Sequence, residues 1–161
     1  MSSALLSDFL RENSISAEMQ SLSDSTSTVA DAANALGVTP DHIVKSVLLV
    51  ADSVPVLVIA CGTSRIDTKA VASHLGVSKK RVKLADPVTV REVTGFDVGG
   101  VPPFGHKSSI RTLIDNRVLS LSWVYAGGGV SNKVLKLSIA DILRATGAEP
   151  VNLSPVASES G

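Results

Sequence analysis

The sequence predicts a single domain of the mixed α/β class, with a curved mixed β-sheet flanked by helices. Three observations lead to this prediction. The length of 161 residues is typical of one domain. Apolar runs typical of strands are mixed with amphipathic segments, and hairpins outnumber regular strand–helix–strand units. No internal repeat or linker divides the chain, so we expect a core over residues 29–153 and a mobile tail over residues 154–161.

The first half of the chain begins with two expected helices. The spacing of Leu6, Phe9 and Leu10 predicts a helix over residues 3–12. A Ser/Thr-rich loop over residues 20–28 follows, and then a helix over residues 29–36 that Gly37 ends.

Two long apolar strands come next. We expect a turn over residues 39–41 and then strands over residues 43–50 and 54–60 that form a hairpin. Both runs are almost continuous in Val, Leu and Ile, so both strands should be central and buried on both faces.

The second half supplies shorter elements. Asp67 and Asp86 are candidate helix N-caps, Pro87 suits the first turn of a helix, and Ser138 with Asp141 resembles a capping box. The elements expected from these signals are, in order, helices over residues 67–75 and 86–93, a Gly/Pro-rich loop over 95–107, strands over 109–115, 120–126 and 134–137, a helix over 138–147 and an edge strand over 151–153.

The composition excludes several classes of protein. Hydrophobic residues make up 44% of the chain, and 15 basic residues balance 15 acidic ones. The chain is therefore too apolar for a disordered protein. It also lacks the basic excess of a protein that reads nucleic-acid sequence, and we expect no DNA partner. Aromatic residues are only 3%, which leaves few rings on which bases could stack. A compact domain with a pocket for a small ligand fits this composition.

We expect the protein in the cytoplasm and away from membranes. A single cysteine, Cys61, allows no disulfide within the chain and suits a reducing compartment. The N-terminus lacks the features of a secretory signal. Asp52, Ser53 and Pro55 interrupt the most apolar stretch, which is therefore unsuited to span a bilayer.

Lys45 is the most informative residue of the first long strand, where it shares a face with Val47 and Leu49. An unpaired ammonium is costly to bury. This lysine therefore either keeps its amine in water at the end of the strand or reaches a pocket that holds an anionic partner. The pattern alone leaves both alternatives open.

Two glycine-rich segments are candidates for the wall of a ligand pocket. Residues 99–105 (Gly-Gly-Val-Pro-Pro-Phe-Gly) combine glycines, which permit close approach of a ligand, with prolines that stiffen the loop. Residues 127–129 are three consecutive glycines after a predicted strand. Neither segment has the spacing of a dinucleotide-binding or phosphate-binding loop. Composition alone favours an ordinary turn for residues 99–105, and residues 127–129 could also be a bulge or turn.

The remaining candidates favour structural roles. His42, His74 and His106 have no metal-ligand spacing with one another or with Cys61, so we expect no metal site. His106 lies near the glycine segment and is a weak candidate for ligand contact, whereas Cys61 is typical of a small buried residue. Residues 79–83 form a dense basic run that suits a solvated face and is a weak candidate for phosphate contact.

Together these segments resemble the YbaK / prolyl-tRNA-synthetase-associated editing family. The resemblance lies in Lys45 with the strand that follows it, in residues 99–105, in residues 127–129 and in residues 137–143 (Leu-Ser-Ile-Ala-Asp-Ile-Leu), and it covers about residues 29–153. It implies a mixed, barrel-like sheet with surrounding helices. It also implies an aminoacyl-tRNA deacylase, free-standing or inserted in a synthetase, that hydrolyses the ester of a mischarged tRNA.

The resemblance also implies residue roles. Lys45 matches the family lysine and would hold the terminal phosphate or the aminoacyl carbonyl, and Gly99 and Gly100 match the loop whose backbone faces the ester. No cofactor is needed, because the ester is already activated and the substrate's own ribose hydroxyl helps to orient the water. The further residues expected to contact the 3′ terminal nucleotide or the amino acid are Ser46, Val101, Pro102, Gly127, Gly128, Gly129, Ser131 and Asn132.

The sequence departs from the family pattern where the substrate is selected. Residues 130–134 (Val-Ser-Asn-Lys-Val) contain neither the histidine of alanine-specific members nor the Arg-Gly-Leu-Asp-like segment of cysteine-specific members. The edited amino acid and any synthetase partner therefore stay open. Two other functions also stay open, namely a non-hydrolytic module that binds an amino acid, a nucleotide or a tRNA end, and a hydrolase that uses Cys61 as nucleophile.

Overall fold

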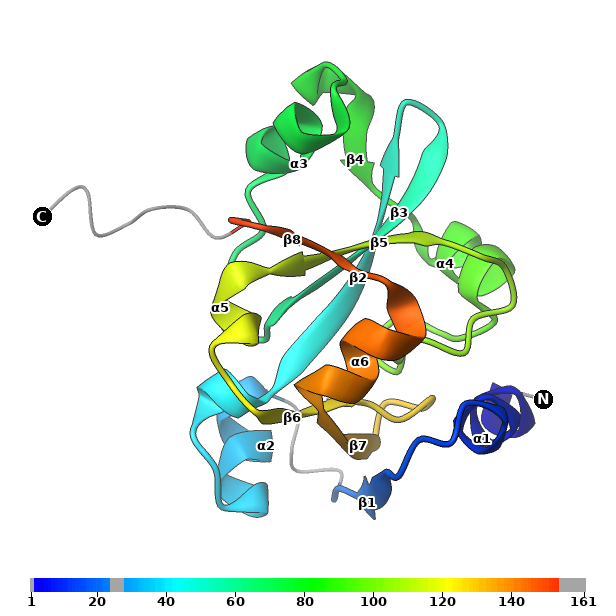
Figure 1. The fold of residues 1–161 in the computed structure, drawn as a ribbon, viewed down its shortest axis with the longest axis vertical. Helices are drawn as coiled ribbons and strands as arrows, with labels where there is room; N and C mark the ends of the chain where they lie inside the picture. The colour runs from blue at the N-terminus through cyan, green and yellow to red at the C-terminus, as the bar shows by residue number, and fades with distance from the viewer. Residues whose placement is uncertain (1, 24–27, 154–161) are drawn as a thin grey trace, which may run out of the picture.

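The protein is described by a computed structural model that covers residues 2–23 and 28–153 (Figure 1). The expected tail over residues 154–161 lies outside the described residues, as do residues 24–27 of the expected loop. The elements are, in chain order, α1 (Ser2–Glu12), β1 (Glu18–Ser21), α2 (Val29–Leu36), η1 (Pro40–His42), β2 (Val44–Ala51), β3 (Val54–Cys61), α3 (Thr68–Leu75), η2 (Lys79–Arg81), β4 (Val82–Leu84), α4 (Pro87–Thr94), β5 (Arg111–Asp115), α5 (Asn116–Leu119), β6 (Trp123–Gly127), β7 (Lys133–Ser138), α6 (Ile139–Thr146) and β8 (Glu149–Val151).

The mixed α/β class is confirmed, but the strands form two sheets. Five strands lie in the order β4-β2-β3-β5-β8, in which β5 runs parallel to both β3 and β8 and the other pairs are antiparallel. Three antiparallel strands lie in the order β1-β7-β6. A parallel bridge between Ile43 and Tyr125 joins the sheets where β2 begins. The sheets meet at this corner and do not close into a barrel.

The hairpin of β2 and β3 runs through the middle of the molecule (Figure 1). Strand β3 is buried on both faces, as its apolar run predicts. Leu57 and Ile59 contribute to the core between the two sheets, where β7 and α6 also pack. Val56 and Val58 point the other way, into a second core that includes Val71 of α3. Alternate residues of one strand therefore supply two cores.

The predicted helix boundaries are confirmed where side chains cap them. Asp67 Oδ1 accepts from the Lys69 and Ala70 amides, and Asp86 Oδ1 accepts from the Thr89 amide at 2.8 Å. Ser138 Oγ accepts from the Asp141 amide at 3.1 Å, so α6 begins as the capping pattern predicts. No helix among residues 2–23 and 28–153 is long and apolar enough to cross a membrane.

Several boundaries differ from the prediction. Gln20 and Ser21, expected in a loop, belong to β1, because this polar segment pairs with β7 at the edge of the small sheet. Residues 116–119 form the unexpected helix α5, since Asp115 caps it through the Arg117 amide. Strand β6 consequently starts at Trp123 and not at residue 120, and β5 starts at Arg111, two residues later than expected. The edge strand expected over residues 151–153 is β8, which pairs with β5 over residues 149–151.

Candidate functional site

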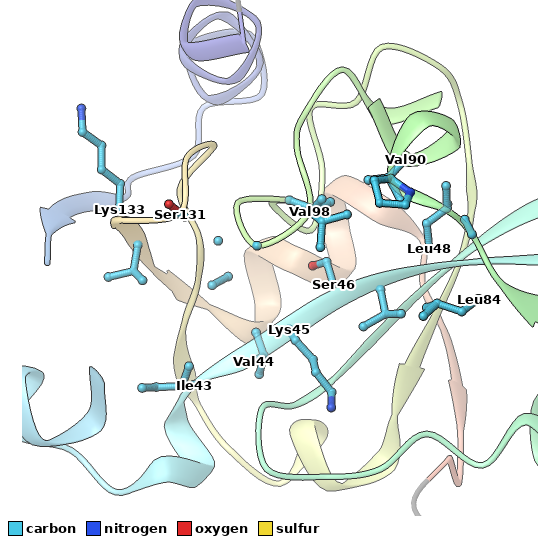
Figure 2. A pocket seen from close by; sticks show the side chains of 18 residues that line it. Ile43, Val44, Lys45, Ser46, Leu48, Leu84, Val90, Val98, Ser131 and Lys133 are labelled. Atoms are coloured by element: carbon cyan, nitrogen blue, oxygen red, sulfur yellow. The ribbon is translucent and has the colours of Figure 1, made fainter. Parts of the chain in front are cut away.

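A cavity of about 410 Å³ lies beside the part of β2 that β4 does not cover (Figure 2). β4 pairs with residues 49–51 of β2, and the Ala85 amide donates to Leu48 O at 3.0 Å. The chain then turns into α4, so the neighbouring part of β2 faces the cavity. Segments around residues 98–101 and 126–134 form the opposite wall. The volume is within the usual range of small-molecule sites, about 300–1,000 Å³.

The cavity brings together part of the predicted site. Among the described residues, four of the eighteen that line it have polar side chains, and the others are apolar or glycine. The predicted residues in the lining are Lys45, Ser46, Gly99, Val101, Gly127 and Ser131. The predicted residues outside the lining are Gly100, Pro102, Gly128, Gly129 and Asn132.

The glycine wall consists of two backbone segments in direct contact. A Cβ at Gly127 would lie 2.3 Å from Val101 O, and a Cβ at Gly100 would lie 2.8 Å from the backbone of Val130. The Gly129 amide donates to Gly100 O at 2.8 Å across the same contact. These glycines are needed because any side chain would separate the two segments.

Gly99 and Gly100 have different positions in this wall. Gly99 is exposed, has a φ of +93° and borders the cavity. Gly100 is buried, and its amide donates to Asp97 O at 3.1 Å, so its two backbone groups hold the wall together. Of these loop residues, Gly99 and Val101 line the cavity, and Gly100 does not.

His106 supports the same loop from behind. Its Nε2 lies 2.7 Å from Pro102 O, and its ring meets Phe96 edge-on at a centroid distance of 6.3 Å. Burial lowers the pKa of His106, an effect that the hydrogen bond to Pro102 opposes in part. A neutral imidazole whose Nε2–H donates to this carbonyl fits the contact.

Lys45 and Ser46 extend from opposite sides of β2 (Figure 2). Lys45 Nζ donates to Ser64 O at 2.5 Å, and Arg117 Nη1 donates to Ser64 Oγ at 3.2 Å, so two cations meet at the loop after β3. Burial lowers the pKa of Lys45, and the nearby Cys61 opposes this shift. An ammonium has three donors, so the contact with Ser64 O leaves capacity to bind an anion.

Ser46 faces the apolar interior of the cavity. It lies on the same side of β2 as Val44 and Leu48, which are both buried. Its Oγ is buried, and within the described part of the chain it has no hydrogen-bond partner.

The other polar positions lie at the entrance. Ser131 and Lys133 line the cavity and are exposed. Asn132 lies outside the lining, and its carbonyl accepts from the Leu22 amide at 2.6 Å, which ties this segment to the end of β1. Lys133 places a second cation at the entrance. The sequence analysis did not predict Lys133 as a site residue, although it lies within residues 130–134.

The sequence also missed the wall formed by β4 and α4. Leu84, Pro87 and Val90 line the cavity on this side, and Val98 lines it from the loop after α4; Leu84 and Val98 are 71% and 59% exposed. The Asp86-Pro87 helix start marked where α4 begins, but no local pattern shows that this helix packs beside β2. Two large apolar side chains exposed at one entrance would have been a signal only once the fold was known.

Cys61 and the other isolated candidates lie outside this lining. Cys61 is buried with its Sγ 3.6 Å from Asp41 O, and burial raises the pKa of the thiol, which disfavours the nucleophilic thiolate. His74 contacts Glu149, and the His42 ring packs against Trp123 in a tilted arrangement at a centroid distance of 4.5 Å. Among residues 2–23 and 28–153, three or more His, Cys, Asp or Glu side chains do not gather as a metal site.

The chain is similar to a family of known proteins. Residues 23–145 match the model of a family described as "Aminoacyl-tRNA editing domain". Over 91 residues the chain is 30% identical to the proline–tRNA ligase of Thermoanaerobacter sp. (strain X514), a match that covers 56% of this chain but 16% of the ligase. Over 98 residues it is 32% identical to the multifunctional Ser/Thr-tRNA deacylase ProXp-y of Escherichia coli (strain K12). This match covers 60% of this chain and 58% of the deacylase.

A solved structure is similar over almost the whole chain. It is the crystal structure of a candidate trans-editing enzyme for prolyl tRNA synthetase, with a TM-score of 0.88 and 30% identity, and the match covers 96% of this chain and 97% of that one. The family model covers most of the segment that carried the resemblance. The chain therefore belongs to the aminoacyl-tRNA editing domain family.

Proposed function

We propose that this protein is a trans-acting aminoacyl-tRNA deacylase, which hydrolyses the ester of mischarged tRNA in the cavity beside β2. The observation that carries the proposal is the cavity itself. It has a buried apolar interior, a backbone wall and a cation on its border, in a chain of the editing family. An amino acid esterified to a terminal nucleotide needs these three features, namely a side-chain pocket, hydrogen bonds to the ester and a partner for phosphate.

The chemistry needs no nucleophilic side chain. A water oxygen attacks the ester carbonyl carbon, and the bond between that carbon and the ribose oxygen breaks. The ribose oxygen takes up a proton, so the products are the free amino acid and tRNA with a free hydroxyl. The adjacent ribose hydroxyl orients the water, and holding the two reactants together supplies a large part of the barrier reduction, up to about 7–11 kcal/mol in well-oriented cases.

The loop of residues 99–101 stabilises the developing oxyanion in this proposal. Gly99 and Val101 border the cavity, whereas the backbone groups of Gly100 are used inside the wall. Oxyanion stabilisation by fixed backbone dipoles is effective because the dipoles do not reorganise during the reaction. Pro102, Gly128, Gly129 and Asn132 act indirectly, since they hold the wall that Val101, Gly127 and Ser131 present.

Lys45 binds the terminal phosphate or the aminoacyl carbonyl in this proposal. Its stem lines the cavity and its ammonium has donors beyond the one on Ser64 O. The net charge of zero fits a brief hold on one tRNA end better than a broad grip on the backbone. The reaction requires no cofactor, and its place is the cytoplasm, where tRNA is charged. A synthetase that releases the mischarged tRNA is the expected partner.

The test is a deacylation assay. The protein is incubated with one tRNA body charged with each of several amino acids, and loss of the ester is followed for the parent and for Lys45→Ala. We expect hydrolysis of at least one ester and a loss of about 10- to 100-fold in kcat/KM for the variant, the range of one charged hydrogen bond. Binding without turnover on every ester would favour the non-hydrolytic module and contradict the proposal.

A further inference from the structure

One edge of β2 is open beside the cavity. On this edge β4 pairs with residues 49–51, and the bridge between Ile43 and Tyr125 lies just before the strand begins. Between these contacts, no strand in the described part of the chain pairs with residues 45–47 on this side. An open strand edge presents backbone N–H and C=O groups that can bind another molecule as a further strand would bind.

The backbone groups of Ser46 point toward this open edge. In an antiparallel pair, alternate residues direct both their N–H and their C=O to the partner strand. Pro55 of β3 has no N–H and lies opposite Val50, so Val50 belongs to the residues of β2 that point away from β3. Leu48 belongs to the same set, because its carbonyl accepts from the Ala85 amide on the β4 side. Ser46 comes two residues earlier, so both its backbone groups point away from β3.

The accessible part of Ser46 is its backbone edge and not its hydroxyl. The residue lines the cavity and is half-buried, whereas its Oγ is buried. The accessible surface of Ser46 therefore belongs to its backbone and Cβ atoms. One donor and one acceptor are thus available to a molecule in the cavity without any contribution from the side chain.

The charges of the lining favour a backbone acceptor for an aminoacyl group. Such a group carries an α-ammonium, which is costly to bury without a partner. The described lining contains no Asp or Glu, and its two charged side chains, Lys45 and Lys133, repel an ammonium. Apart from the exposed Ser131 hydroxyl, the accessible acceptors of this lining are backbone carbonyls, and the carbonyl of Ser46 lies on the open edge.

We propose that the open edge of β2 at Ser46 binds the aminoacyl group of the substrate in the way it would bind one residue of a further strand. Ser46 O accepts from the α-ammonium, and the Ser46 N–H donates to the ester carbonyl oxygen, as in a hydrogen-bonded pair of an antiparallel sheet. This inference rests on the proposed function. The Ser46 amide then stabilises the oxyanion together with the loop of residues 99–101.

Hydrogen exchange of the Ser46 amide tests this contact in the unaltered protein. The probe is adenosine with its 3′ oxygen replaced by nitrogen, acylated with the amino acid whose ester the parent hydrolyses fastest, so that it binds without reacting as an ester. At a probe concentration about ten times its Kd, we expect NMR to show about tenfold slower exchange of the Ser46 amide, because exchange then requires release of the probe.

The Met19 amide is the control for this measurement. Met19 is exposed on the free edge of β1, outside the lining. The Leu22 amide donates to Asn132 O, so alternation directs the Met19 amide away from β7, as the Ser46 amide is directed away from β3. Its exchange rate should not change when the probe binds.

A proline at position 46 removes the donor while the pairing with β3 stays. Pro55 shows that this hairpin accepts a proline where the N–H points away from the partner strand. We expect kcat/KM for deacylation to be at least about tenfold lower in Ser46→Pro than in Ser46→Ala, which also lacks the hydroxyl but keeps the N–H. Met19→Pro places a proline on the other open edge and should retain the parent value. Circular dichroism shows whether each variant is folded.

A change in the substrate tests the acceptor. Replacing the α-ammonium of the same ester by a hydroxyl keeps the size of the group and removes its charge. Each enzymatic rate is divided by the uncatalysed rate of the same ester, because the ammonium also activates the ester in water. We expect this ratio to fall by about 3- to 10-fold, the difference between a charged and a neutral hydrogen bond.

The outcomes separate this inference from the proposed function. If no ester is hydrolysed, the proposed function fails, and the role of the β2 edge with it. Deacylation stands and the role of the edge is contradicted if the probe binds without slowing exchange of the Ser46 amide. The same conclusion follows if folded Ser46→Pro is as active as Ser46→Ala, or if the hydroxyl ester is accelerated as much as the aminoacyl ester.

Discussion

The two walls of the cavity are built in different ways. The β2 wall is regular secondary structure whose successive side chains extend to opposite sides of the strand, as Ser46 and Lys45 do (Figure 2). The opposite wall is two irregular segments whose backbones touch at Gly100 and Gly127. One wall is a paired strand, and the other is held together by backbone contacts between two loop segments.

The two walls therefore determine different properties of the site. Side chains of β2 determine which chemical groups the cavity offers, and the glycine wall determines the shape of the cavity. A substitution on β2 changes one functional group while the strand pairing stays intact. A substitution in the glycine wall adds atoms where the backbones touch, so it moves the wall as a whole. We therefore expect the largest effects on folding from the glycine wall and the most selective effects on activity from β2.

The largest effect is expected from Gly127→Ala. The new Cβ would lie 2.3 Å from Val101 O, closer than any tolerated contact, so the two segments must separate. We expect the free energy of unfolding to fall by about 3 kcal/mol, measured by denaturant titration, together with loss of deacylation. Gly37→Ala is the control, because no described atom lies within 4 Å of its Cβ and only backbone strain, about 1 kcal/mol, is added. Equal losses in the two variants would contradict the steric account of the wall.

The next effect concerns the charge on β2. Lys45→Met keeps most of the side-chain length and removes the ammonium. We expect kcat/KM to fall by about 10- to 100-fold while the free energy of unfolding changes by less than about 1 kcal/mol. Lys45→Arg retains a cation and should recover part of the activity. A Met variant as active as the parent would show that β2 contributes no cation to the reaction.

The smallest effect is expected from His106, which lies behind the loop of residues 99–105. Burial lowers the pKa of His106 below its ordinary value of 6.5, so the unfolded chain binds a proton at this site more readily than the folded one. The free energy of unfolding should therefore decrease as the pH falls below about 6.5. His106→Gln does not titrate and can still donate to Pro102 O, so it should reduce this pH dependence in unfolding measurements between pH 5 and 8. If the free energy of unfolding depends on pH in the same way in the variant and in the parent, His106 is not the source of that dependence.

The sequence predicted the parts of the fold that local signals determine. Apolar runs located β2 and β3, and Asp67, Asp86 and Ser138 located three helix starts through their caps. It missed β1 because a four-residue polar edge strand is stabilised by pairing with a distant partner. The division into two sheets depends on long-range contacts in the same way, so one curved sheet was expected instead.

The site was predictable only where a residue type is informative in itself. Lys45 stood out as a cation in an apolar strand, and the glycines at 99, 100 and 127 stood out as clusters. The unpartnered state of Ser46 Oγ and the β4–α4 wall depend on how segments distant in the chain meet. The difference between Gly99 and Gly100 likewise appears only in the hydrogen bonds of the folded loop.

The central claim is that the ester is cleaved in the cavity beside β2, and two matched valines test it most directly. Val98 at the cavity entrance is 59% exposed, and Val54 at the turn of the β2–β3 hairpin is 57% exposed, so tryptophan at either position projects into solvent and leaves the core intact. We predict that Val98→Trp lowers kcat/KM for deacylation by at least about tenfold, because it obstructs the entrance, and that Val54→Trp retains the parent value. Equal activity of the two variants on an ester that the parent hydrolyses would contradict the claim.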